Sequence, residues 1–206
     1  MALPLFPDSR TRAEEEHRRA QKAMAEAQRT ANPVRLFMLG LDIKEALDKA
    51  LALDPDNVQV RLDLVRFHVT APRIAGGSND EARKQAAEIA KRDAPLGAFA
   101  RGYIAYRAKE YGAARGAFRE AINTTKDAAT KSMAMRWLGW LSQEMQQYEE
   151  AFAMFDALHD SYEIGRTSAF CQCQKERGRA ALNEYLRGDD KTHVEDAKKL
   201  LAKLTP

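Results

Sequence analysis

Two copies of one residue pattern, placed 37 residues apart, constrain the fold of this 206-residue chain more than any other feature. Each copy begins with a glycine and continues with four residues at fixed offsets of 9, 12, 16 and 19 positions. The copies are Gly102, Tyr111, Ala114, Phe118, Ala121 and Gly139, Tyr148, Ala151, Phe155, Leu158. A repeat with fixed offsets predicts a stacked array of helical hairpins. We expect each glycine to let the second helix approach closely, opposite Ala114 or Ala151.

The composition agrees with an all-α fold. Ala, Leu, Glu, Lys, Arg, Gln and Met dominate, and long runs of β-branched residues are absent. The chain is long enough to bury a sizeable core. We predict an extended tail at 1–9, which contains Pro4 and Pro7, and a single helical repeat domain at 10–206.

Apolar periodicity, prolines and capping residues predict ten helices. Ser9 or Thr11 is expected to cap the first helix, and Ser78 with Glu81 forms a capping box. In the second helix Leu36 and Met38 are among the residues expected to be buried. The predicted helices span about 10–30, 34–53, 58–69, 78–93, 96–108, 110–123, 127–145, 147–159, 162–186 and 193–204.

The glycine, tyrosine, alanine and phenylalanine offsets resemble the tetratricopeptide repeat (TPR), most clearly over 97–158. Leu138 precedes Gly139, and Pro55 closes an earlier half-repeat, as in that family. The insertion Ala-Pro-Arg-Ile-Ala-Gly-Gly-Ser at 71–78 is similar to one in bacterial TPR-like proteins. The resemblance implies a right-handed α-solenoid of antiparallel helical hairpins that binds a partner polypeptide in its concave groove.

Aromatic and basic residues surround both glycines on the side that the resemblance places in the groove. Both tryptophans of the chain fall within four residues, and aromatic residues with Arg are enriched in binding hot spots. Two alternatives stay open: these side chains fill the core between neighbouring hairpins, or they contact the C-terminal helix. The candidate partner-binding residues are Phe99, Tyr103, Tyr106, Arg107, Arg136, Trp137, Trp140 and Gln143.

The charge pattern argues against nucleic acid and membrane partners. The net charge is only +3, and acidic residues interleave with the basic ones, even in the helix at 10–31. No apolar run approaches the roughly 18 residues of a membrane span. The first residues lack the features of a signal peptide, which makes the cytoplasm the default compartment. A chain whose signal peptide had been removed would look the same and would belong in the periplasm or outside the cell.

No motif predicts catalysis, a metal or a cofactor. The four histidines are far apart, and no nucleophile–base pair or paired-carboxylate signature is visible. Gly76-Gly77 lacks the residues of a phosphate loop and is interpreted as a structural turn. Cys171 and Cys173 fall in a predicted helix, where residues two apart point about 200° from each other, so we expect one buried and one partly exposed thiol. A reactive or disulfide-forming pair is the alternative.

The sequence therefore predicts a protein-interaction module, an adaptor or assembly scaffold without enzymatic activity. Its partner is another polypeptide, and a homo-oligomer is compatible with the sequence. The alternative function is a small-ligand or lipid-binding TPR-type protein that uses the same groove as a pocket.

Overall fold

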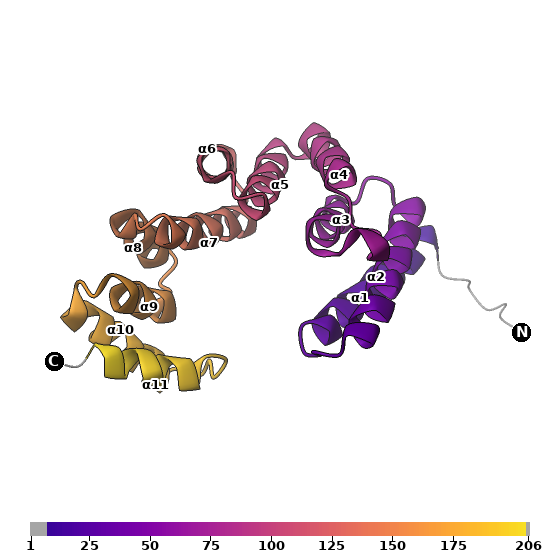
Figure 1. Ribbon diagram of the computed structural model, residues 1–206. Helices are drawn as coiled ribbons and strands as arrows, with labels where there is room; N and C mark the ends of the chain where they lie inside the picture. The colour runs from indigo at the N-terminus through magenta and orange to yellow at the C-terminus, as the bar shows by residue number, and fades with distance from the viewer. Residues whose placement is uncertain (1–7, 205–206) are drawn as a thin grey trace, which may run out of the picture. The chain divides into compact units, whose positions relative to one another are not determined.

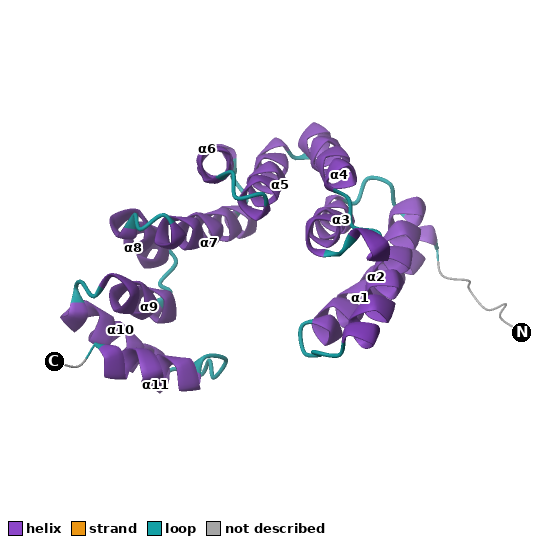
Figure 2. Ribbon diagram, in the orientation of Figure 1, coloured by secondary structure: helices purple, strands orange, loops and turns teal. Residues whose placement is uncertain are grey.

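The computed structural model describes residues 8–204, and this range contains 11 α-helices, one short 3-10 helix and no strand (Figures 1 and 2). The prediction of an all-α fold is therefore confirmed. The chain divides into an N-terminal unit, 1–108, and a C-terminal unit, 109–206. One continuous repeat domain over 10–206 stays a prediction, and residues 1–7 of the predicted tail lie outside the described residues.

The N-terminal unit is a run of antiparallel helices, each of which packs against the next. A 3-10 helix, Arg73–Ala75, interrupts the connection between α3 and α4 and contacts α2. The helices are α1 (Ser9–Ala27), α2 (Pro33–Leu53), α3 (Val58–Thr70), α4 (Asn79–Arg92) and α5 (Ala94–Arg107).

The C-terminal unit continues the same pattern (Figure 1). In this unit α8, α10 and α11 all pack against α9. The helices are α6 (Tyr111–Thr124), α7 (Ala128–Glu144), α8 (Tyr148–Ala157), α9 (Ser161–Cys171), α10 (Lys175–Arg187) and α11 (Val194–Lys203). Within 8–204, none of the helices is long and apolar enough to cross a membrane.

Short polar side chains define most helix starts, as the sequence predicts. The first cap differs from the prediction: Asp8, rather than Ser9 or Thr11, accepts a hydrogen bond from the Thr11 amide at 2.7 Å. Ser78 accepts from the Glu81 amide at 3.3 Å. The Glu81 carboxylate accepts from Lys84 instead of reaching back, so only half of the predicted capping box forms.

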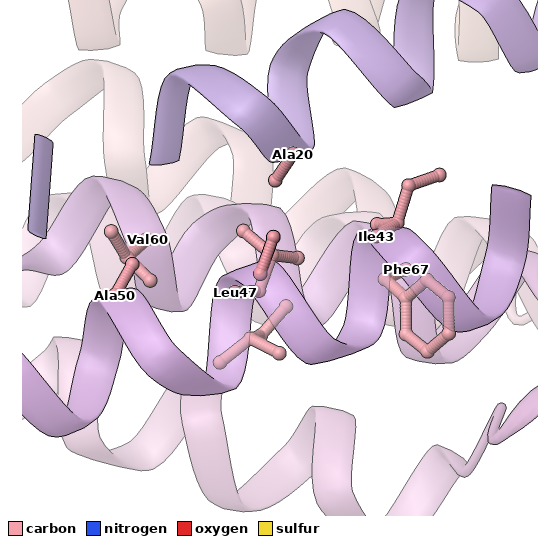
Figure 3. Packing of buried hydrophobic residues seen from close by; sticks show 8 residues of the cluster. Ala20, Ile43, Leu47, Ala50, Val60 and Phe67 are labelled. Carbon is pink, nitrogen blue, oxygen red and sulfur yellow. The ribbon is translucent and has the colours of Figure 1, made fainter. Parts of the chain in front are cut away.

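A cluster of buried apolar residues joins the first three helices (Figure 3). Ala20 of α1 is completely buried, which allows α1 to approach α2 closely. From α2 and α3 come Ile43, Ala46, Leu47, Ala50, Val60, Leu64 and Phe67. The buried residues of α1 are small alanines, and this close packing against α2 explains how α1 belongs to the folded unit.

The first turns of α2 are more exposed than predicted. Leu36 is 39% exposed and Met38 is 48% exposed, because the buried face of α2 begins at Leu39. Val34, Phe37, Met38 and Leu41 instead form an outward apolar stripe at helical spacing. The prediction that Leu36 and Met38 are buried was wrong, since hydrophobicity without a clear period does not indicate which face is covered.

The Gly76-Gly77 loop is held by backbone contacts, as its interpretation as a structural turn requires. A side chain at Gly77 would meet the Ala71 carbonyl oxygen at 1.8 Å, and Gly76 has φ of +93°. The buried His68 ring donates from Nδ1 to the Gly76 carbonyl at 3.1 Å. Burial lowers the pKa of His68.

Glycines set the close contacts between helices of the C-terminal unit. A Cβ at Gly139 would lie 2.6 Å from Cζ of Phe155, so the residue opposite this glycine is Phe155, not Ala151 as predicted. In the next hairpin a Cβ at Gly165 would lie 2.3 Å from Cγ of Leu182. Gly139 is therefore a packing residue, and the Phe155 ring fills the space that it leaves.

The predicted helix at 162–186 is two helices, α9 and α10, which form an antiparallel hairpin. The chain turns at Gln172 and Gln174, whose φ angles of 52° and 46° are left-handed. Cys171 and Cys173 form a disulfide across this turn, with Cα atoms 5.1 Å apart. The prediction of two thiols was wrong because the cysteines do not share a helix, so the helical angle between them does not apply.

Substitution of Gly139 by alanine should destabilise the protein by about 1–3 kcal/mol, because the Phe155 ring must move to admit the methyl group. The matched control is Gly116→Ala, at an exposed position of α6 where nothing lies within 4 Å of the new methyl group. That change should stabilise by about 0.5–1 kcal/mol. Urea unfolding followed by circular dichroism measures both, and a stabilising Gly139→Ala would contradict the packing.

Removal of the disulfide should lower stability only modestly. The bridge spans two positions, and the chain-entropy relation gives about 1.5 kcal/mol for so short a loop against about 4.7 kcal/mol for a hundred-residue loop. We expect Cys171→Ser/Cys173→Ser to remain helical, with a slightly lower urea midpoint. Alkylation without reductant should label neither cysteine of the native protein, and full labelling would show that the bridge is absent.

Candidate functional site

The predicted site residues on α5 differ widely in exposure. Phe99 is completely buried and Tyr103 is 6% exposed, so both side chains belong to the interior of the protein. Tyr106 is half-buried and Arg107 is exposed. The part of this set that a partner can reach is therefore Tyr106 and Arg107.

The predicted residues on α7 are better placed for recognition. Arg136 is exposed, and Trp137 and Trp140 are half-buried with their rings edge to face at 5.1 Å between centroids. Gln143 is buried, and its amide donates to Thr167 Oγ1 at 2.7 Å and to Glu163 at 3.3 Å. Gln143 thus ties α7 to α9 and faces the interior rather than a partner.

Arg136 and Trp140 line an open cleft of about 590 Å³ within the C-terminal unit. The other lining residues come from the α8–α9 turn, α9, the end of α10 and the α10–α11 loop. They are Leu158, His159, Asp160, Ser161, Tyr162, Glu163, Glu184, Tyr185, Gly188, Asp189, Asp190 and His193. The α7 half of the predicted site is therefore one wall of a larger cavity.

Glu163 anchors the base of this cleft. Its carboxylate accepts from Trp140 Nε1 at 2.9 Å and from Arg166 Nη1 at 3.0 Å to each oxygen. Only 5% of Glu163 is exposed, and a buried carboxylate requires such partners. These bonds fix the orientation of the Trp140 ring, which stands between the cleft and the protein interior.

Aromatic rings from α9, α10 and the α10–α11 loop also line the cleft. His193 stacks on Tyr162 at 4.4 Å between centroids, and Tyr162 lies 5.3 Å from Tyr185. The Tyr162 hydroxyl donates to Asp196 at 2.6 Å, and the Tyr185 hydroxyl accepts from the His193 amide at 2.8 Å. Together these contacts hold the α10–α11 loop against α9.

The cleft is predominantly acidic. Five carboxylates line it, against one guanidinium, and that guanidinium, Arg136, lies 3.3 Å from Asp160. No group of three or more His, Cys, Asp or Glu side chains within 8–204 is arranged to hold a metal ion. An acidic cleft with aromatic walls is suited to bind a polar or cationic group.

Sequence reasoning missed the α9–α11 side of the cleft. Tyr162, Tyr185 and His193 lie far apart in sequence and meet only because the chain reverses at 172–174, where a continuous helix was predicted. The available signal was the Gly188-Asp189-Asp190 turn, in which two acidic residues follow a helix end. That turn alone does not indicate a cavity.

Comparison with known proteins gives a similar fold but no family. No family model matches the sequence, and no curated protein matches it. The structure is similar to the one from the functional characterisation of Pseudomonas aeruginosa PilF, with a TM-score of 0.57 and 17% identity over 94% of this chain and 90% of that one. The MamA crystal structure gives a TM-score of 0.43 at the same identity and coverage.

PilF is a TPR-repeat protein, and at 17% identity the similarity extends to the fold alone. The prediction of a TPR-like helical repeat fold is confirmed.

The alkaline titration of Tyr162 tests the aromatic wall. Burial and the hydrogen bond to Asp196 raise the pKa of its phenol well above the ordinary value of 10.0. The raised pKa favours the folded state fully below pH 10.0, and this contribution is lost as the pH rises through the folded-state pKa. The ultraviolet titration of the wild type minus that of Tyr162→Phe, recorded while the protein is still helical, should show a midpoint above pH 10.0. A midpoint at the ordinary value would contradict the Tyr162–Asp196 contact.

Proposed function

We propose that this protein is an interaction scaffold whose C-terminal unit holds a segment of a partner polypeptide in the cleft beside Trp140. The observation that carries the proposal is that Arg136, Trp140, Tyr162 and Tyr185 all line one open cavity. The TPR-type fold supports the scaffold role in general.

The chemistry of the cleft suits a peptide. Trp and Tyr side chains offer large contact areas at a small loss of conformational entropy. Trp140 and Tyr162 are oriented by Glu163 and Asp196, so little reorganisation accompanies binding. On α5, Tyr106 and Arg107 remain proposed additional contacts for the partner.

Binding of a small molecule is the second candidate function. The volume of about 590 Å³ falls within the range of ligand pockets, which favours this reading. The five carboxylates disfavour a lipid chain, because charged groups lose hydration against an apolar ligand. The open side of the cleft favours a ligand that continues beyond it, as a polypeptide does.

The disulfide indicates which cellular compartment suits the protein. Disulfides persist mainly in oxidising compartments, whereas the cytoplasm keeps cysteines reduced. The Cys171–Cys173 bridge therefore favours the periplasm or the extracellular space over the cytoplasm as the proposed compartment.

Peptides selected from a random display library on the immobilised protein test the function. We expect Trp140→Ala to weaken binding at least ten-fold, because the indole is a wall of the cleft. Trp137→Phe is the matched control, since Trp137 does not line the cleft and a phenylalanine keeps an aromatic ring against Trp140. Fluorescence polarisation measures affinity, and circular dichroism verifies folding.

The fluorescence of the protein provides a second measurement. The chain has two tryptophans, so the emission change on peptide binding should persist in Trp137→Phe and disappear in Trp140→Phe. Failure to select any peptide, or equal effects of the Trp137 and Trp140 substitutions, would contradict the proposed function.

A further inference from the structure

Three exposed carboxylates form what we call the acidic rim of the cleft. Glu184, Asp189 and Asp190 come from the end of α10 and the loop that follows, and all three are exposed. Among the described residues, neither Glu184 nor Asp189 has a cationic partner, in contrast to Asp160 and Glu163 at the base. These rim carboxylates are thus available to a molecule that enters the cleft.

Among the described residues, the neighbouring cations form no ion pair with the rim carboxylates. Lys191 Nζ donates to the Gly188 carbonyl, and Arg187 Nε donates to the Asn183 carbonyl. Neither side chain lines the cleft. Hydrogen bonds from Thr192 hold the pKa of Asp190 below its ordinary value, so this carboxylate is ionised at neutral pH.

The helix itself adds negative potential at the same place. α10 ends at Arg187, and the last carbonyl groups of a helix carry a partial negative charge. Gly188, Asp189 and Asp190 follow that end directly. Carboxylates at the negative end of a helix repel one another and the helix dipole, and an incoming cation relieves this repulsion.

The aromatic walls complement the acidic rim. Trp140, Tyr162 and Tyr185 line the same cavity as these carboxylates, and the His193 ring covers one face of Tyr162. Aromatic faces attract Lys and Arg cations, most strongly where water is partly excluded. A Lys or Arg side chain matches both the aromatic and the acidic groups that line this cavity.

We propose that the cleft selects a basic segment of its partner polypeptide, with a Lys or Arg side chain lying between the aromatic walls and the rim of Glu184, Asp189 and Asp190. This inference rests on the proposed function and specifies the chemistry of its ligand. The open side of the cleft lets the rest of the segment continue along the surface.

The sequences and affinities of the display-selected peptides test this selection. We expect them to be enriched in Lys or Arg, and replacement of the basic residues by glutamine should weaken binding at least ten-fold. Affinity should also fall as the salt concentration rises from about 0.1 M to about 1 M, because the Debye length shortens from about 10 Å to about 3 Å.

The rim is tested with Glu184→Gln/Asp189→Asn/Asp190→Asn, for which we expect at least a ten-fold loss of affinity. The matched control is Glu149→Gln/Glu176→Gln/Glu195→Gln, which removes the same charge from exposed residues of the same unit that do not line the cleft. The control should change affinity less than two-fold. Circular dichroism melting of both variants shows whether they remain folded.

The outcomes separate this inference from the proposed function. Selected peptides that lack basic residues, or that bind the rim variant as well as the control, overturn the basic-segment inference and leave the scaffold function standing. Failure to select any peptide overturns both. Spermidine that quenches the Trp140 emission of a protein that binds no peptide would identify a small-cation site instead.

Discussion

Close approach of antiparallel helices at glycine is the constraint on which the C-terminal unit depends. Gly139 receives the Phe155 ring of α8, and Gly165 receives Leu182 of α10. Since successive helical residues are about 100° apart, a fixed contact at Gly139 also fixes the direction of Trp140. The same contact that stacks α7 on α8 therefore turns the indole toward the cleft. The glycine contributes to the site although it touches no ligand.

The buried carboxylate of Glu163 links the packing of α7 on α9 to the cleft. Glu163 binds Trp140 and Arg166, and the buried Gln143 amide adds a bond from α7. A buried acid left without these donors would be strongly destabilised, so the group favours one arrangement of α7 on α9. Gln143 was predicted as a groove residue, and its actual contacts explain why it matters without reaching a partner.

The sequence predicts those parts of the structure that local chemistry determines. Helix ends follow prolines and capping side chains, and the glycine repeat predicts the hairpins. Arg136 and Trp140 were predicted as site residues because the TPR resemblance places the residues around Gly139 in the groove, and both line the cleft. The turn at Gln172 and Gln174 escaped prediction since it contains neither Gly nor Pro, and a disulfide spans it. The cleft wall built by Tyr162, Tyr185 and His193 depends on that turn, so it was missed as well.

The cleft is lined by two kinds of residue: helical wall residues that also stabilise the fold, and residues of the exposed loop after α10. Its walls are helical residues whose hydrogen bonds also hold α7, α9 and α11, so substitutions there change folding and binding together. Asp189 and Asp190 belong to a short exposed loop that follows α10 and carries no core residue. Asp190 accepts from the Thr192 amide, and asparagine at this position removes the charge while keeping an oxygen for that bond. Under the proposed function, loop substitutions alone would exchange one class of partner for another, while glycine-mediated packing keeps the aromatic walls in place.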